Sequence, residues 1–236
     1  MKEGFMNKRL DSVIIVQARM ESSRLPGKVM KELCGTPLID HLLTRLSHIP
    51  CRGLKVAVSS HPASHVLVEY LSRKEYRVIT GHPDNLYQRF LQALENEHPR
   101  SLVRVTADNP LTDTDAICRG VETLIDENLD YLWMDRIPVG CGCDIFKTDS
   151  FYGLSEEILS FPEKEHIVPI FRNRPHLTGK GLPCPYPENA GRLRLTVDTE
   201  SDYRNMQRIF SEHCREGSSI DLPSLIHSEM QRAGLF

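Results

Sequence analysis

Apolar residues follow two patterns that alternate through the first half of the chain. Short apolar runs, the first of them Val13–Val16, are typical of strands that are buried on both faces of a sheet. Apolar residues three or four positions apart are typical of helices with one buried face. The runs predict strands at 13–16, 54–59, 77–80 and 102–105, and the spaced residues predict helices at 38–48, from Pro62 to about residue 71, and at 86–94.

This alternation of strands and helices predicts an α/β fold. The sheet should be mostly parallel and Rossmann-like, with helices on both faces. Ligands bind such sheets at the carboxyl ends of the strands. We therefore expect the polar residues that follow the strands to share one rim, namely Gln17–Arg19, Ser59–Ser60, Thr80–Gly81 and Thr106–Asp108.

The second half of the chain is less regular. Its pattern predicts strands at 130–134, 143–146 and 192–197, and helices at 148–159 and from Thr199 to about Phe210. The segment from Arg174 to Asn189 contains four prolines and two glycines, and could be a lid, an interface arm or a plain loop. A chain of 236 residues is expected to form a single domain.

Composition excludes several classes of protein. The net charge of −3 argues against a general nucleic-acid-binding protein. No apolar run has the length of a membrane span, and the first ten residues lack the apolar core of a signal peptide. The seven cysteines fit no zinc-binding spacing, so we expect reduced thiols in a cytoplasmic protein.

The loop after the first strand carries candidate phosphate-binding residues. Arg19, Ser23, Arg24 and Lys28 surround a Pro26-Gly27 turn signal. Arginine and lysine bind phosphate by a planar fork of donors and by a compact charge, respectively. The loop is not a Walker A motif, and no G-x-G-x-x-G follows a predicted strand, which argues against NAD-type binding. The alternative is a basic loop that is simply solvated.

Two aspartates that end predicted strands are candidate metal ligands. Asp108 and Asp198 each follow an apolar run, and carboxylates at the rim of a nucleotide pocket are suited to Mg²⁺. Asp108 alone could equally be a turn residue. Asp113 and Asp115 form a D-x-D pattern that glycosyltransferases use for a metal, but the helix that follows favours N-capping. The adjacent Glu165 and His166 could act as acid and base, although most such pairs only form hydrogen bonds at surfaces or interfaces.

Five motifs occur in an order that resembles the cytidylyltransferase family. They are Q-A-R-x-x-S-S-R-L-P-G-K-V, G-x-x-D-N-L-x-x-R-F, V-R-V-T-x-D-x-P-L, E-H-I-V-P-x-F and L-R-L-T-V-D-T-x-x-D-Y, between Val13 and Tyr203. The family includes spore-coat polysaccharide biosynthesis proteins and the synthetases of CMP-sialic acid and CMP-3-deoxy-manno-octulosonate. The resemblance implies a fold of the nucleotide-diphospho-sugar transferase type. It also implies Mg²⁺-dependent transfer of CMP from CTP to a sugar or sugar acid, with release of pyrophosphate, in surface polysaccharide biosynthesis.

The resemblance also assigns roles to residues of this chain. Arg19, Arg24, Lys28, Asp108 and Asp198 would be catalytic, with Asp108 and Asp198 as the Mg²⁺ ligands. The remaining positions would bind the nucleotide (Gln17, Ala18, Ser23, Gly81, Asp84, Asn85 and Arg104) or the acceptor (Arg89, Asp144, Glu165 and His166). A small inserted subregion at 136–192 would serve dimerisation or acceptor binding in a homodimer.

Three positions differ from the residues frequent in this family. Glu21 replaces Gly, Ala107 and Asn109 flank Asp108 where Gly and Cys or Glu are frequent, and Asp144 replaces Glu. These differences leave the acceptor and the turnover open. Two other hypotheses therefore remain: a glycosyltransferase with Asp113 and Asp115 as its metal site, and a non-catalytic nucleotide-binding subunit.

Overall fold

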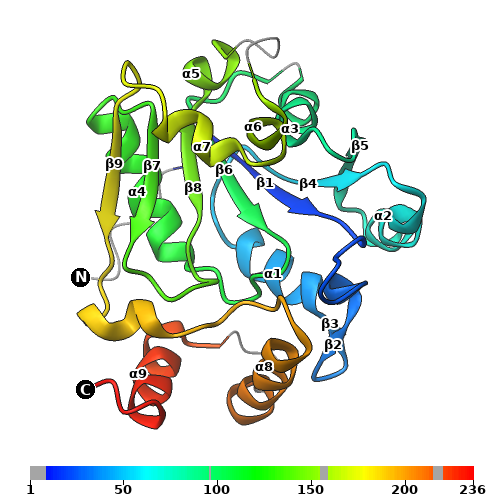
Figure 1. Cartoon of the computed structure of the whole chain (residues 1–236), viewed down its shortest axis with the longest axis vertical. Coiled ribbons are helices and arrows are strands. Elements are labelled where there is room, and N and C mark those ends of the chain that lie inside the picture. The colour runs from blue at the N-terminus through cyan, green and yellow to red at the C-terminus, as the bar shows by residue number, and fades with distance from the viewer. Residues whose placement is uncertain (1–8, 96, 155–158, 215–219) are drawn as a thin grey trace.

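A seven-stranded sheet with the order β5-β4-β1-β6-β8-β7-β9 forms the centre of the computed structural model (Figure 1). The model describes residues 9–95, 97–154, 159–214 and 220–236. The strands of the sheet are β1 Ser12–Ala18, β4 Gly53–Ser59, β5 Arg77–Gly81, β6 Ser101–Thr106, β7 Tyr131–Asp135, β8 Asp144–Lys147 and β9 Gly179–Pro183. A separate small hairpin pairs β2 Glu32–Leu33 with β3 Thr36–Pro37.

Helices connect these strands and extend the chain beyond them. The α-helices are α1 Leu38–Ser47, α2 His65–Arg73, α3 Leu86–Leu94, α4 Thr114–Asp126, α5 Thr148–Tyr152, α6 Phe161–Glu165, α7 Ile167–Arg172, α8 Glu200–His213 and α9 Leu222–Arg232. Short 3-10 helices are η1 Lys28–Met30, η2 Pro62–Ser64 and η4 Glu188–Arg192. Among the described residues, no helix is long and apolar enough to cross a lipid bilayer.

Both faces of the sheet are covered, as the unbroken apolar run in β1 predicts. Ile14 and Val16 pack with residues of α1, α2 and α4, whereas Val13 and Ile15 pack with residues of α3, α5 and α7. Successive side chains of a strand point to opposite faces, so one strand contributes to two apolar layers. A third cluster joins α8 and α9 to Leu25 and Leu38, and Figure 1 shows these two helices beyond one end of the sheet. The α/β prediction with helices on both faces is confirmed.

The direction of chain progression reverses between β1 and β6. From β1 the chain moves outward through β4 to β5, and then returns to place β6 on the other side of β1. All four strands are parallel. The carboxyl ends of β1 and β6 therefore flank a topological switch point, the usual ligand position in open α/β sheets.

Two predicted elements are wrong. Residues 192–195 alternate between exposed and buried, but residues 195–197 are all buried, and only Arg194 pairs, through a single bridge to Val139. The alternation reflects packing of Leu193, Leu195 and Val197 against the α8–α9 cluster, not a ladder. The predicted 148–159 helix ends at Tyr152, where Gly153 forms its C-cap; part of the predicted span lies outside the described residues.

The sequence predicted β8 as a strand at 143–146 but not its direction, and it predicted neither β9 nor α9. The Pro-rich segment contains β9, which pairs parallel with β7 at the edge of the sheet. β8 runs antiparallel to both β6 and β7, so the sheet is mixed in its second half. α9 begins at the N-cap Asp221. The segment 136–192 thus contributes β8 and β9 to the central sheet, while its role in dimerisation or acceptor binding stays a prediction.

Candidate active site

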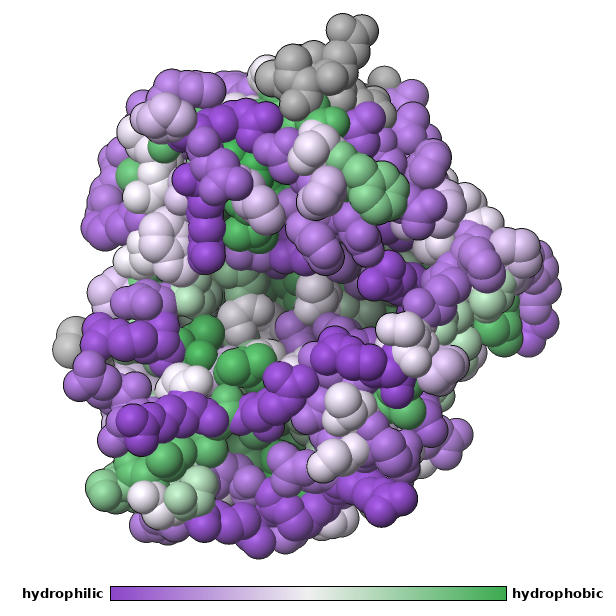
Figure 2. All heavy atoms as spheres, viewed as in Figure 1, coloured by the Kyte–Doolittle hydropathy of each residue, from purple (hydrophilic) through white to green (hydrophobic). Residues whose placement is uncertain are grey.

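A polar pocket of about 230 Å³ lies at the carboxyl ends of β1 and β6. Figure 2 shows the surface hollowed across its middle and rimmed by hydrophilic residues. The pocket brings together most of the predicted site. Its lining includes Gln17, Ala18, Arg19, Ser23, Arg24, Lys28, Asp84, Arg89, Asp108, Glu165, His166 and Asp198.

The loop after β1 folds back so that its lysine enters the pocket. Gly27 has a φ of 69°, which favours glycine, and its N–H donates to the Met20 carbonyl at 2.9 Å. The Leu25 N–H donates to the Ser22 hydroxyl at 3.3 Å. These bonds close the loop, and η1 begins directly after it at Lys28. Lys28 is only 8% exposed.

Lys28 bridges the two predicted metal ligands. Its Nζ donates to Asp108 Oδ2 at 2.5 Å and to Asp198 Oδ1 at 2.9 Å. The two carboxylates are brought together by the backbone, because the Val197 N–H donates to the Asp108 carbonyl at 3.0 Å. The two aspartates that the sequence suggested as a pair therefore lie together, although only Asp108 follows a strand.

Asp198 is fixed from its other side. Arg194 Nη2 donates to Asp198 Oδ2 at 2.8 Å, and Arg194 Nε donates to Asp202 Oδ1 at 2.7 Å. Asp202 Oδ2 in turn accepts the Asp198 N–H at 3.0 Å. Burial acts to raise the pKa of Asp198, but the hydrogen bond and charge of Lys28, together with Arg194, hold that pKa below its ordinary value. Asp198 is therefore a carboxylate in the neutral pH range, with Oδ1 directed at Lys28.

The donor set at this point fits a hard divalent cation. Asp108 and Asp198 each present a carboxylate oxygen to one shared position, which a positive group already occupies as the Lys28 ammonium. Mg²⁺ is typically bound in proteins through one or two carboxylates, with substrate phosphates and water completing its shell. The two aspartates would hold such an ion, and a phosphate-bearing ligand in the open pocket beside them would complete its shell.

The opposite wall of the pocket carries a buried arginine. Arg89, on α3, is 5% exposed, and its Nε has no hydrogen-bond partner among the described residues. Burial, and then the charge of Arg19, lowers the pKa of Arg89 to about 10. Glu165 approaches Arg19 at 3.5 Å rather than pairing with Arg89. Arg89 lines the pocket, so its guanidinium adds positive charge that suits an anionic ligand there.

A second hollow of about 200 Å³ adjoins the pocket and shares Thr106 with it. Arg104 connects the two, because its Nε donates to Gln17 Oε1 at 2.7 Å and its Nη1 to Asp144 Oδ2 at 2.5 Å. The predicted residues Arg104 and Asp144 thus line the second hollow instead of the first.

Sequence reasoning missed Trp133 and Arg172 in this second hollow. The Arg172 guanidinium lies 5.2 Å from the centre of the Trp133 ring. Arg172 has no carboxylate within ion-pair distance among the described residues. Trp133 is the single tryptophan of the chain, and Arg172 follows the E-H-I-V-P-I-F stretch directly, so both could have been noted.

Some predicted residues lie outside the pocket lining. The Asn85 side chain accepts the Gln88 N–H and caps α3. Gly81 lies where a Cβ would collide with Arg89 and Gln92, so it makes room for the α3 side chains. Ser59–Ser60 and Thr80, at the ends of β4 and β5, are also absent from the lining, because these strands lie on the far side of β1.

The residues that motivated the two alternative hypotheses lie outside the pocket or form hydrogen bonds with other parts of the chain. Asp113 caps α4 through Oδ1 and accepts the Tyr186 hydroxyl on Oδ2 at 2.8 Å, which confirms the N-cap prediction. Neither carboxylate of the D-x-D pattern lines the pocket. Glu21 accepts hydrogen bonds from Ser59 and Ser64, so its charge is directed away from the phosphate loop.

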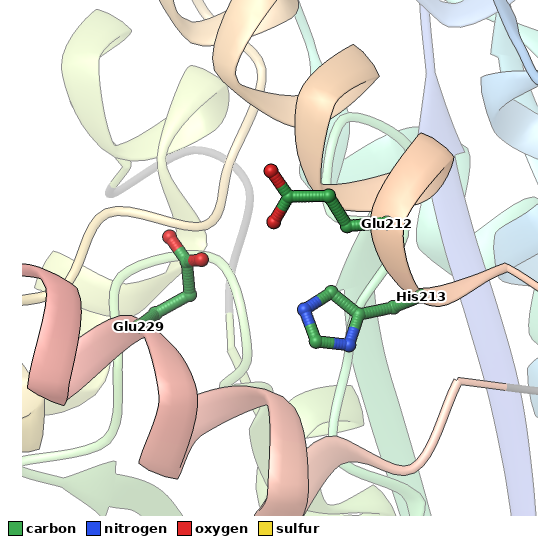
Figure 3. A group of neighbouring side chains, drawn as sticks. All are labelled: Glu212, His213 and Glu229. Atoms are coloured by element: carbon green, nitrogen blue, oxygen red, sulfur yellow. The ribbon is translucent and has the colours of Figure 1, made fainter.

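One further cluster of potential ligands is an ion-pair network. Glu212, His213 and Glu229 face one another between α8 and α9 (Figure 3). Arg208 contacts both glutamates, at 2.9 Å and 2.6 Å, and Arg232 contacts Glu212 at 2.7 Å. Two guanidinium groups therefore neutralise this cluster and join the two helices.

Comparison with known proteins identifies the family of this chain. The family model described as cytidylyltransferase matches residues 13–214. The spore coat polysaccharide biosynthesis protein SpsF of Bacillus subtilis is 28% identical over 209 residues, which cover 86% of this chain and 87% of SpsF. A cytidylyltransferase from Leptospira borgpetersenii has a TM-score of 0.83 at 23% identity, with 96% of each chain covered. The CMP:2-keto-3-deoxy-manno-octonic acid synthetase in complex with CTP has a TM-score of 0.64 at 15% identity, with 85% of this chain and 98% of that chain covered. With the match extending over most of its length, this chain belongs to the cytidylyltransferase family of nucleotidyltransferases.

Proposed function

We propose that this protein transfers a cytidylyl group from CTP to the hydroxyl of a sugar or sugar acid, and releases pyrophosphate. The observation that carries the proposal is the pair Asp108 and Asp198 facing Lys28, Arg19 and Arg24 across one pocket. The product would enter surface polysaccharide biosynthesis, as the name of SpsF suggests for that relative. The likeness to a synthetase solved with CTP supports the choice of nucleotide.

The cationic side of the pocket is suited to the triphosphate. Arg19 and Arg24 are 52% and 61% exposed, and they pair with Glu165 at 3.5 Å and with Asp198 Oδ1 at 3.0 Å. Because exposed ion pairs are weak, these side chains can exchange their carboxylates for phosphate oxygens. Lys28 is buried at the base of the pocket, next to the carboxylates. We assign the arginine forks and the lysine charge to the β- and γ-phosphates, where negative charge accumulates as pyrophosphate leaves.

Mg²⁺ is the cation that we propose for Asp108 and Asp198. When bound, it would neutralise charge on the phosphates and orient the reacting oxygens. Arg194 and Asp202 fix the Asp198 carboxylate, with Oδ2 held by Arg194 and Oδ1 in contact with Lys28 and Arg24. The chain therefore contributes positioning and electrostatic stabilisation, and no side chain is assigned as a covalent nucleophile.

We propose that the acceptor binds in the second hollow. This hollow shares Thr106 with the nucleotide pocket, so an acceptor there would lie beside the bound nucleotide. Trp133 and Arg172 both line this hollow, and the Arg172 guanidinium, which lies over the Trp133 ring, offers a positive charge. Arg104 is already neutralised by Asp144, so Arg172 is the available cation for an acidic group.

Pyrophosphate release with Mg²⁺ tests this function. CTP should be compared with the other nucleoside triphosphates against a panel of sugar acids and amino sugars. Asp108→Asn and Asp198→Asn should lower the rate by at least about 100-fold, since loss of outer-shell groups alone costs 10–100-fold. Asp115→Asn is the matched control, because it removes the same charge from an exposed residue outside the pocket.

Each outcome separates the hypotheses. Release that requires CTP, an acceptor and both pocket carboxylates supports the transferase. Activity lost in Asp115→Asn but kept in Asp108→Asn would instead support the glycosyltransferase hypothesis. Tight CTP binding without release across the panel would favour a nucleotide-binding subunit.

A further inference from the structure

The Lys28 ammonium lies at the position that the two aspartates would offer to a metal ion. Its Nζ contacts Asp108 Oδ2 at 2.5 Å and Asp198 Oδ1 at 2.9 Å. The lysine side chain is only 10% exposed, and the two carboxylates are 21% and 19% exposed. This is a largely buried bridge, not a mobile surface contact.

The ammonium and a divalent ion cannot share this position. Mg²⁺ binds carboxylate oxygens at about 2.0–2.1 Å, whereas the ammonium needs the same oxygens at hydrogen-bond distance. A second positive group so close would also be repelled strongly in a partly buried site. Metal entry therefore requires that Lys28 leave at least one carboxylate.

The carboxylates do not depend on Lys28 for their placement. Asp198 keeps its bond from Arg194 and the backbone bond to Asp202, at 2.8 Å and 3.0 Å. The Asp108 backbone is tied to Val197 at 3.0 Å. If the lysine moves away, the two carboxylates keep their places. Arg24 still contacts Asp198 Oδ1 at 3.0 Å, but its side chain is 61% exposed and can turn toward solvent or phosphate.

We propose that Lys28 is a resident counter-ion that keeps the metal position closed until a nucleotide triphosphate draws its ammonium away. This inference rests on the proposed function for the identity of the nucleotide. Lys28 also lines the pocket, and its flexible four-carbon chain can redirect the charge from the carboxylates to phosphate oxygens. Nucleotide binding and metal binding are then coupled, because the binding-competent state for the metal is a minority in the free protein.

Manganese binding to the nucleotide-free protein tests the proposal. Mn²⁺ is titrated against the full chain, and the free ion is followed by electron paramagnetic resonance. Lys28→Met should bind Mn²⁺ about tenfold or more tightly than the unmodified protein, since an ammonium no longer competes for the carboxylates. Lys28→Arg, which keeps a charged donor at the position, should stay within about threefold of the unmodified protein.

A second variant controls for the loss of charge. Lys31→Met removes the same charge three residues away, where the ammonium lies 4.8 Å from the Tyr203 ring and outside the pocket lining. It should leave Mn²⁺ affinity unchanged. If Lys28→Met is too unstable to titrate, Lys28→Gln and the Mn²⁺-induced rise in melting temperature provide the same comparison, with a larger rise expected for the variant.

Equal Mn²⁺ affinity in the unmodified protein and Lys28→Met would overturn the proposal. An equal gain in Lys28→Met and Lys31→Met would also overturn it, because general charge would then explain the effect. The Mn²⁺ measurement does not depend on turnover. If no acceptor yields pyrophosphate, the proposed function fails, but the comparison of Mn²⁺ affinities still tests the role of Lys28.

Discussion

Replacing Asp202 by asparagine should weaken both the fold and the site, and the structure allows the size to be worked out. Asp202 lies in the first turn of α8, and its side chain is 11% exposed. Oδ1 accepts from Arg194 at 2.7 Å, and Oδ2 accepts from Arg194 at 3.1 Å, from the Asp198 N–H at 3.0 Å and from the Thr199 N–H at 2.9 Å. The two carboxylate oxygens thus accept hydrogen bonds both from the Arg194 guanidinium and from the backbone N–H groups at the start of the helix.

Asparagine keeps one acceptor oxygen and turns the other into a donor. Whichever way the amide is oriented, donors of the arginine or of the backbone then face an N–H group. Hydrogen bonds to charged groups contribute about 1.5–3 kcal/mol each, and a negative charge at a helix N-terminus adds about 0.3–1 kcal/mol. We expect Asp202→Asn to lower the free energy of unfolding by about 3 kcal/mol, or roughly 6–12 °C in melting temperature.

The difference between the variant and the unmodified protein should depend on pH. The hydrogen bond from Arg194, acting against burial, holds the pKa of Asp202 well below its usual range. A carboxylate with a lowered pKa stabilises the fold above its unfolded value of about 4, and this contribution is lost as the pH falls through the folded value. Urea unfolding at pH 7, 5 and 3 should therefore show the full difference at pH 7 and 5 and a smaller one at pH 3.

Glu200→Gln is the matched control for this prediction. It removes the same charge from the same turn of α8, but Glu200 is 52% exposed and contacts only Arg204, at 3.4 Å, among its ion-pair partners in the described chain. Its cost should stay below about 1 kcal/mol, from the weak surface ion pair and the charge at the helix N-terminus together. A loss in Asp202→Asn that equals the control, or that is independent of pH, would refute the reasoning.

Three further perturbations follow from the structure. Gly140→Ala should lower the free energy of unfolding by more than about 2 kcal/mol in urea, because φ is 96° and a Cβ would lie 2.4 Å from the Leu195 carbonyl. Tyr186→Phe should cost about 1–2 kcal/mol in thermal unfolding, since Asp113 loses a hydrogen bond of 2.8 Å, while the KM for CTP stays unchanged. Arg172→Met should raise the KM for an acidic acceptor about tenfold without changing the KM for CTP; an equal rise in both would contradict the assignment of the second hollow.

Local sequence determined much of what surrounds the site. The apolar run at 13–16 specified a strand buried on both faces, and the helical spacing at 86–94 matched α3 Leu86–Leu94. Asp113 was identified as a cap because a helix follows it directly. These features depend on residues within one or two turns of each other. The spacing of apolar residues and the capping residues were therefore sufficient to predict them.

The alternation of polar and apolar residues gave a wrong prediction where side-chain packing, and not strand pairing, caused the alternation. Residues 192–197 alternate as a strand does, yet their apolar side chains fill the α8–α9 cluster and only Arg194 makes a bridge. The antiparallel insertion of β8 between β6 and β7 was equally hidden, since periodicity does not specify a strand's neighbours.

The sequence by itself thus determined the alternating strands and helices of the first half and the rim at the ends of β1 and β6, and it supplied the candidate residues for phosphate and metal. Tertiary structure decided which of them meet. Lys28 lies 80 residues from Asp108 and 170 residues from Asp198, and its bridge exists only because the loop after β1, the end of β6 and the start of α8 converge. The second hollow likewise needs Trp133 of β7 beside Arg172 of α7. Such contacts reflect the balance of burial and charge over the whole fold, and no local window of the chain contains both partners.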